Sequence, residues 1–135
     1  MEEGPILEEL KEKGYVKVKG KVVYLKDVAR KTKGKKIVYS GDTAPCKNVV
    51  SLAKGADLLI HDGTFMESPE VKREHLKRHT SVTAAAKIAK SARVKKLILT
   101  HFSRRYKDLS KLVEEARKIF PNTYAAKDLM EVVIE

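Results

Sequence analysis

Short apolar segments alternate along the chain with longer helical patterns, and this alternation limits the fold more than any other feature. Three such segments, residues 36–40, 58–60 and 97–100, each end in a turn that carries polar side chains. Apolar residues spaced three and four positions apart predict helices between them. The predicted helices cover residues 6–13, 45–53, 71–78, 82–92 and 108–120, and further strands cover 15–19, 22–25, 123–125 and 130–134. We therefore expect an α/β domain whose central strands are parallel and covered on both faces.

The length and the cysteine count exclude several classes of protein. A chain of 135 residues fits one small domain, and a hydrophobic fraction of 42% can form its core. The single cysteine, Cys46, excludes an internal disulfide and a metal site built of cysteines alone. No apolar run is long enough for a membrane span, and residues 1–5 do not resemble the start of a signal peptide. We expect a soluble, cytoplasmic protein that does not bind a membrane.

Positive charge is concentrated in one part of the sequence. The chain has a formal net charge of +11, and residues 72–107 contain 12 basic side chains but one acidic one. Such a segment favours a polyanionic partner, with RNA or DNA phosphate as the first candidate. The alternative is a heat-adapted composition, because the chain has 22 lysines, two asparagines and no glutamine. Charge alone leaves both interpretations open.

Polar, metal-capable side chains follow three of the predicted strands. Asp42, His61 and His101 each stand where a strand ends, and ligands of parallel sheets gather outside those carboxyl ends. Asp42 alone is as readily a helix cap or a turn residue, and His101 alone is as readily a buried histidine bonded to backbone. Together, a carboxylate and an imidazole suit zinc. Zinc takes three or four ligands from proteins, so we expect this chain alone not to retain zinc tightly.

A further histidine, His79, precedes the predicted helix 82–92, and basic and hydroxyl side chains flank it. The free N–H groups at a helix start favour an anion. A histidine at that place can give a proton to a leaving oxygen. The alternative is a turn residue without chemistry. His75, in the helix before it, is expected to be merely solvated.

Five strings in a fixed order resemble one protein family. They are Tyr39-Ser40-Gly41-Asp42-Thr43, His79-Thr80-Ser81 before an alanine-rich helix, Leu99-Thr100-His101-Phe102-Ser103-Arg104-Arg105-Tyr106, Phe120-Pro121-Asn122-Thr123 and Ala126-Lys127-Asp128-Leu129-Met130. Together they resemble the C-terminal half of ribonuclease Z, the tRNA 3′-processing endonuclease of the metallo-β-lactamase fold. The resemblance covers nearly the whole chain, and its most specific part is the Leu-Thr-His-Phe-Ser segment.

The resemblance implies a fold and a set of roles. Residues 1–135 would form the C-terminal half of an αββα sandwich, with a mixed sheet flanked by helices. Asp42 would bridge two zinc ions and His101 would ligate one of them. His79 would assist proton transfer as the phosphodiester breaks.

The same resemblance indicates where the substrate lies. The enzyme would remove the 3′ trailer of a precursor tRNA, and Ser103 and Arg105 would lie near its phosphates. His61 and Asp62 would fall in a loop close to the scissile end of the RNA. A two-metal site of this type neutralises charge that develops on phosphate oxygens during in-line attack.

The chain also departs from the family pattern. The motif His-x-His-x-Asp-His, which supplies most zinc ligands, is absent, since no histidine precedes His61. Asp62-Gly63 replaces the usual Glu-Ala, and Thr80-Ser81 inverts the usual order of the two hydroxyl residues. We therefore expect the isolated chain to be inactive, or nearly so, without a missing N-terminal half or a companion chain.

Two alternatives to the nuclease remain, and one expectation concerns assembly. The chain could be a basic RNA-binding remnant that has lost catalysis, or another phosphodiesterase or hydrolase of the same superfamily. Half of a sandwich leaves one apolar face without its covering layer. This predicts either self-association, as in a homodimer or other homo-oligomer, or binding of a complementary chain.

Overall fold

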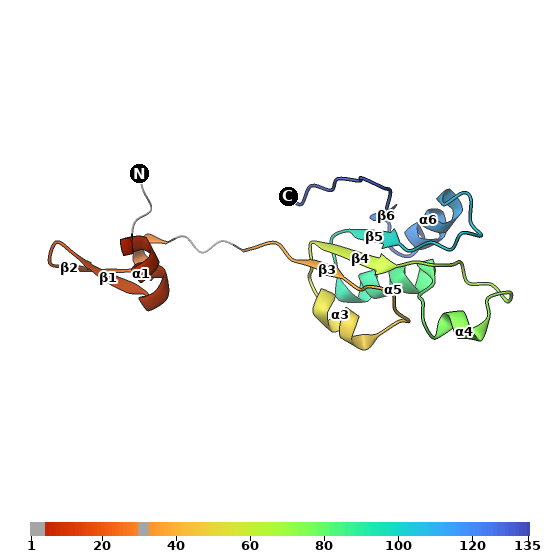
Figure 1. The fold of residues 1–135 in the computed structure, drawn as a ribbon, viewed down its shortest axis with the longest axis horizontal. Coiled ribbons are helices and arrows are strands. Elements are labelled where there is room, and N and C mark those ends of the chain that lie inside the picture. Colours follow the sequence, from red (N-terminus) through yellow and green to blue (C-terminus); the bar gives the residue numbers. More distant parts are fainter. Residues whose placement is uncertain (1–4, 30–32) are drawn as a thin grey trace. The chain divides into compact units, whose positions relative to one another are not determined.

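The computed structural model describes residues 5–29 and 33–135. These residues belong to two compact units, Met1–Gly34 and Lys35–Glu135, whose elements are labelled in Figure 1. Each unit is described by itself. The segment Lys31-Thr32-Lys33-Gly34-Lys35-Lys36, whose sequence predicts a charged link, falls partly outside the described residues.

The first unit is a helix followed by a hairpin. Helix α1 (Pro5–Lys13) ends at Gly14 and leads into the antiparallel strands β1 (Tyr15–Val18) and β2 (Lys21–Tyr24). The predicted helix and hairpin are confirmed. The helical turn α2 (Leu25–Val28) begins at the residue where the second strand was expected to end.

The second unit contains a four-stranded parallel sheet in the order β3-β4-β5-β6 (Figure 1). Its strands are β3 (Ile37–Tyr39), β4 (Leu58–Asp62), β5 (Leu97–Thr100) and β6 (Thr123–Ala125). Because strand side chains alternate between faces, Val38, Leu59 and Leu97 stand in one row, and each is at most 4% exposed. The α/β fold class is confirmed, and all four predicted strands form where the apolar runs indicated.

Helices pack against that buried row. The three longest helices of this unit are α3 (Lys47–Ala53), α5 (Val82–Ala92) and α6 (Ser110–Arg117), and they share one apolar core with the sheet. Helix α5 has the predicted bounds, and its alanines at positions 85, 86, 89 and 92 are fully buried. Small residues on this face let the helix backbone approach the sheet closely. None of the described helices is long and apolar enough to cross a membrane.

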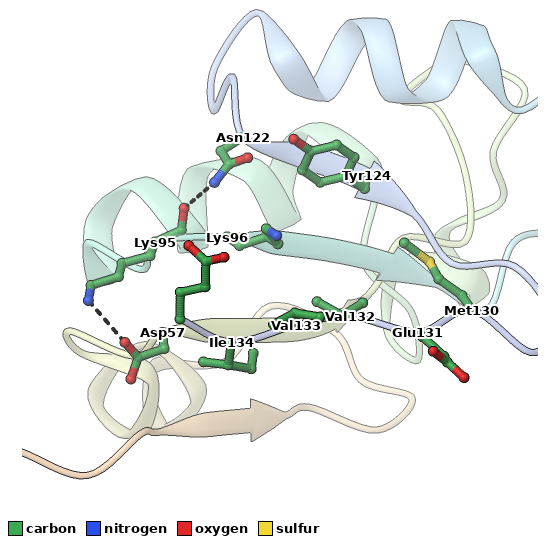
Figure 2. A pocket seen from close by; sticks show the side chains of 11 residues that line it. Asp57, Lys95, Lys96, Asn122, Tyr124, Met130, Glu131, Val132, Val133 and Ile134 are labelled. Atoms are coloured by element: carbon green, nitrogen blue, oxygen red, sulfur yellow. Dashed lines mark hydrogen bonds and ion pairs between the residues drawn. The ribbon is translucent and has the colours of Figure 1, made fainter.

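The expected cover on both faces is confirmed only in part, because the opposite face of the sheet buries Leu58 and Ile98, each 4% exposed, but leaves other side chains open. Ile37, Tyr39 and Tyr124 occupy it with exposed fractions of 56%, 64% and 40%. The C-terminal residues 130–135 border a hollow next to Lys96 and Tyr124 (Figure 2). The strand predicted over residues 130–134 does not form in the described part of the chain. Its residues find no partner strand there, and a strand needs a ladder of hydrogen bonds to a neighbour.

Two helices are shorter than predicted. The helix expected over residues 71–78 is a single turn, α4 (Arg73–Leu76), because it buries no side chain and isolated short helices are marginal in water. The helix expected over residues 108–120 begins at Ser110. Asp108 forms a local turn before the helix, since its Oδ1 accepts hydrogen bonds from the backbone N–H and the hydroxyl of Ser110, and Leu109 is the N-cap.

Candidate active site

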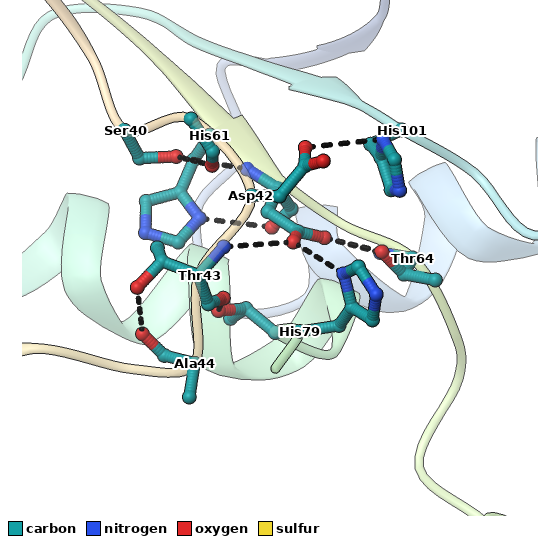
Figure 3. Close-up of polar contacts among 11 residues, drawn as sticks. Ser40, Asp42, Thr43, Ala44, His61, Thr64, His79 and His101 are labelled. Carbon is teal, nitrogen blue, oxygen red and sulfur yellow. Dashed lines mark hydrogen bonds and ion pairs between the residues drawn. The ribbon is translucent and has the colours of Figure 1, made fainter. Parts of the chain in front are cut away.

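Four charged or titratable side chains meet at the carboxyl edge of the parallel sheet (Figure 3). Asp42 follows β3, Asp62 ends β4, His79 precedes α5 and His101 follows β5. Parallel strands bring their carboxyl ends to the same edge, so residues up to 59 positions apart in sequence become neighbours. They form two acid–histidine pairs of different character.

The outer pair consists of Asp42 and His101, whose Oδ1 and Nδ1 atoms are 3.1 Å apart. Both side chains are about half exposed, at 52% and 44%. Each sits on a tight turn, because Gly41 has φ +65° and His101 has φ +61°, in the left-handed region that non-glycine residues rarely adopt. The helix-cap interpretation of Asp42 is wrong, since Cys46 is the N-cap of α3 and no side chain bonds that helix start.

The inner pair consists of Asp62 and His79. Asp62 is fully buried, and its Oδ2 lies 2.9 Å from Nδ1 of His79. The same oxygen accepts a hydrogen bond from the backbone N–H of Thr43 at 3.1 Å. Its Oδ1 accepts hydrogen bonds from the backbone N–H of Thr64, at 3.1 Å, and from the Thr64 hydroxyl. A buried carboxylate with four donors is held in one orientation, and it holds the His79 ring in turn.

The two pairs are joined by their rings. The imidazoles of His79 and His101 are stacked, with centroids 5.0 Å apart and planes inclined by 17°. The ring of His79 is 23% exposed, so it is reachable from solvent on one side. An ionised carboxylate only accepts hydrogen bonds, which assigns the shared proton to Nδ1 of His79 and leaves Nε2 for other chemistry.

The donor atoms of the outer pair are of the type that binds a metal ion, but two ligands are too few to hold one. A carboxylate and an imidazole are ligands of zinc and similar ions. The oxygens of Asp62 are already engaged by hydrogen bonds. Among residues 5–29 and 33–135 no group of three or more His, Cys, Asp and Glu side chains is arranged to hold a metal. The chain therefore offers part of a coordination shell.

His61, the third residue of the predicted rim, lies apart from this constellation. Its ring is fully buried, with Nδ1 2.8 Å from the carbonyl oxygen of Asp62, while Nε2 has no hydrogen-bond partner in the described structure. Burial lowers the pKa of His61, because desolvation disfavours the charged ring. The ring is therefore neutral in the folded protein near pH 7.

The hydroxyl residues before α5 have structural partners. The Thr80 hydroxyl donates a 2.5 Å hydrogen bond to the carbonyl oxygen of Thr43. Ser81 is the N-cap of α5 and accepts a hydrogen bond from the backbone N–H of Ala84 at 3.1 Å. These bonds tie the loop that carries Asp42 to the start of the helix that follows His79.

Ser103 and Arg105 lie in the loop that follows His101. The backbone N–H of Ser103 donates to the carbonyl oxygen of Thr64 at 2.8 Å, and its hydroxyl oxygen accepts from the backbone N–H of Arg105 at 3.4 Å. Both residues border a small hollow together with His75 and Lys72. The loop is thus anchored on the same turn that fixes Asp62.

The sequence did not point to Asp62 as the partner of His79. The resemblance put it only in a loop near the substrate, whereas it is the last residue of β4 and its carboxylate organises the site. A usable signal was present, because an acidic residue at the end of a buried strand, two positions before Thr64, predicts an aspartate that bonds its own loop.

Comparisons with known proteins agree with this architecture. Residues 27–102 match the model of the beta-lactamase superfamily domain. The chain is 49% identical to ribonuclease Z of Ignicoccus hospitalis over 116 residues, which are 85% of this chain and 38% of that protein. It is 42% identical to ribonuclease Z of Saccharolobus solfataricus over 130 residues, 96% of this chain and 44% of that protein. The chain thus spans about two fifths of the length of these curated relatives.

Solved structures show the same likeness. The short form of human tRNase Z matches 84% of this chain and 37% of its own, with a TM-score of 0.57 and 31% identity. The metallo-beta-lactamase fold protein YhfI from Bacillus subtilis matches 67% of this chain and 36% of its own, with a TM-score of 0.59 and 27% identity. The resemblance deduced from the sequence strings is confirmed.

Proposed function

The chain belongs to the beta-lactamase superfamily, and we propose from this membership that it forms part of a ribonuclease Z-type endoribonuclease. The enzyme would remove the 3′ trailer of precursor tRNA in the cytoplasm by hydrolysing one phosphodiester. The carrying observation is the pair of acid–histidine contacts, Asp42–His101 and Asp62–His79, joined by stacked imidazoles on one sheet edge. Similarity to ribonuclease Z extends over the segments that carry all four residues.

Asp42 and His101 would hold the metal, which we take to be zinc. Their donor atoms suit that ion, and both side chains are accessible. The chemistry that zinc supplies when bound is Lewis-acid polarisation of the phosphodiester oxygens. The remaining ligands would come from outside the described residues.

His79 would move the proton. With Nδ1–H held by Asp62, the ring can carry a second proton on Nε2 and give it to the leaving oxygen as the phosphorus–oxygen bond breaks. The oxygen of the attacking water would form the new bond to phosphorus and its released proton would pass to bulk water, while the leaving oxygen departs as a hydroxyl. Asp62 keeps the ring oriented and stabilises its charged form, as a buried acid does for a catalytic histidine. Ser103 and Arg105 would bind nearby phosphates.

The missing ligands motivate a partner. The chain would assemble with an N-terminal half or a companion chain that carries His-x-His-x-Asp-His, and it would be inactive alone. The open sheet face with Ile37, Tyr39 and Tyr124 supports such an assembly, because apolar faces of this kind are normally covered. Self-association through the same face is the alternative.

The test is reconstitution. The chain is mixed with a companion that carries His-x-His-x-Asp-His, and zinc content and cleavage of precursor tRNA are measured with and without it. We expect cleavage in the complex only, a loss of bound zinc for Asp42→Ala, and a loss of at least about 100-fold in rate for His79→Ala. A complex that binds zinc but leaves precursor tRNA intact, or that cleaves equally well with Asp42→Ala, overturns the proposal.

A second candidate is a non-catalytic RNA-binding protein. The observation that favours it is the charge of residues 72–107, with 12 basic side chains and one acidic one, beside an incomplete ligand set. It predicts tRNA binding by the chain alone that weakens steeply with salt, needs no metal and is unchanged in His79→Ala. Hydrolysis of small phosphodiesters without cleavage of precursor tRNA would instead indicate another phosphodiesterase of the superfamily.

A further inference from the structure

A group of basic side chains lies beside the four site residues. The proposed mechanism assigns a role only to Arg105 among them, as a residue that binds phosphate. Lys72, His75, Lys77 and Arg78 surround the single turn α4, and Arg105 comes from the loop after His101. We call these five residues the basic track. All five are exposed, and α4 buries no side chain, so the segment contributes little to the core.

The track borders two hollows that share His75. One hollow is lined by Lys72, His75, Ser103 and Arg105, with Thr64 beneath them. The other is lined by Glu74, His75, Lys77, Arg78 and His79. The track therefore extends from the loop of Ser103 past His75 to the proton-carrying histidine of the inner pair.

The backbone fixes the place of His75 relative to His79. The N–H of His79 donates to the carbonyl oxygen of His75 at 2.9 Å, which is one helical turn. Residues four apart on such a turn lie on the same side. His75 thus stands one turn before His79, and it is exposed, as the sequence predicted.

The charges of the track are not neutralised within the described structure. None of Lys72, Lys77, Arg78 and Arg105 lies within 4.0 Å of a described carboxylate, whereas other lysines, such as Lys95 and Lys118, form ion pairs. The only acidic side chain that lines either hollow is Glu74. A row of unpaired cations beside a polar cleft is typical of a surface that binds a polyanion.

We propose that the basic track binds the phosphate backbone of the RNA strand that leads to the phosphodiester served by His79. The proposal rests on the proposed function and adds to it the residues that seat the strand. Lys77 and Arg78 hold the part of the strand next to His79, Lys72 and Arg105 hold the part further away, and His75 lies between them. Lysine acts on phosphate as a point charge and arginine as a two-pronged donor, so the track positions the strand without reading its bases.

Equilibrium binding tests the track without any need for catalysis. The full chain alone is titrated with a fluorescently labelled tRNA that carries a short 3′ trailer, at several salt concentrations. In Lys72→Ala/Lys77→Ala we expect the affinity to fall about tenfold, and the slope of log affinity against log salt to become shallower by about two units. The matched control is Lys87→Ala/Lys90→Ala, which removes the same charge from the exposed side of α5 in the same basic segment.

The contrast between these two variants decides the proposal. A localised site is supported if the loss of tRNA affinity in the control variant is less than about a third of the loss in Lys72→Ala/Lys77→Ala. Equal losses in both variants, or no tRNA binding by the unmodified chain, overturn it. Because all four lysines are exposed, both variants should keep the thermal unfolding midpoint of the unmodified chain, which separates a binding effect from misfolding.

Cleavage in the reconstituted complex gives a second readout. His75→Ala should raise KM for precursor tRNA severalfold with little change in kcat, whereas His79→Ala should lower kcat, because a strand-binding residue acts on binding and a proton donor on the chemical step. If the complex does not cleave at all while the binding contrast persists, the proposed function fails and the track stands as an RNA site. If the complex cleaves and His75→Ala changes kcat alone, the track fails and the nuclease stands.

Discussion

The inner and outer acid–histidine pairs use the same two residue types in opposite ways. Asp62 is buried and receives four donors, so the orientation of His79 is set within this chain. Asp42 and His101 share one 3.1 Å contact and are half exposed, so each keeps donor capacity for something else. The comparison teaches that this chain alone fixes the inner histidine, while the side chains of the outer pair remain accessible.

Among the variants that test the difference between the two pairs, Asp62→Ala should have the largest effect. The change leaves the Thr43 and Thr64 donors and the His79 ring without their acceptor, and removing one member of a buried charged network costs about 3–5 kcal/mol. We expect the free energy of unfolding, measured in urea, to fall by about that amount. Asp62→Asn, which keeps an acceptor oxygen, should lose less; equal losses would mean that the charge matters more than the hydrogen bonds.

A second test concerns the packing of Gly63, the residue that follows Asp62, against the core. A Cβ added at Gly63 would lie 3.0 Å from Cδ2 of Leu99, a fully buried side chain of β5. We expect Gly63→Ala to lower the free energy of unfolding by about 1–3 kcal/mol, because overpacking displaces the core. Gly34→Ala is the matched control, since a Cβ there meets no atom within 4 Å. Loss of stability in the control alone would contradict the packing argument.

The pH dependence of stability probes the buried histidine behind the inner pair. Burial lowers the pKa of His61 in the folded chain, so below its unfolded pKa of about 6.5 the unfolded state binds more protons. Stability should therefore fall as the pH drops through about 6.5, by at most about 1.4 kcal/mol per pH unit from this one group. Urea unfolding between pH 7.5 and 5.5 measures it. In His61→Gln the free energy of unfolding should depend less on pH. A pH dependence equal to that of the unmodified chain would contradict the lowered pKa of His61.

The smallest effect is expected at the outer pair. Asp42→Ala should change the free energy of unfolding by less than about 0.5 kcal/mol, because exposed ion pairs contribute little to stability. His101 should be changed to Asn, which tolerates its positive φ, and Asn should also be nearly neutral. A loss comparable to that of Asp62→Ala would remove the distinction between the two pairs.

Much of the fold could be predicted because its signals are local. The runs around Val38, Leu59 and Leu97 are short and apolar, and α5 has a regular apolar face with a serine cap, so their positions follow from periodicity and capping. The helix over residues 71–78 could not be delimited this way, because its length depends on whether the fold gives it anything to pack against. The strand expected at residues 130–134 likewise depends on a partner strand, which local pattern does not reveal.

The site was predictable to a similar degree. Parallel strands bring their carboxyl ends to one edge, so the placement of Asp42 and His101 on a shared edge could be predicted. Their direct contact could not, because β4 lies between β3 and β5 and the sequence does not give the strand order. The Asp62–His79 contact could not be predicted either, because it joins a strand end to a loop 17 residues later and depends on how that loop folds back. His61 shows the converse: it stands at a strand end, yet the alternation of side chains turns its ring into the interior.

Thr43 connects both pairs through its main chain. Its N–H donates to Asp62 and its carbonyl oxygen accepts from Thr80, while its own hydroxyl bonds only the adjacent Ala44 carbonyl. These bonds with Asp62 and Thr80 use only the backbone of residue 43, so they can form with any residue type there except one. Proline lacks the N–H that Asp62 accepts from, so that single replacement would loosen the inner acid while leaving all four side chains of the two pairs in the sequence.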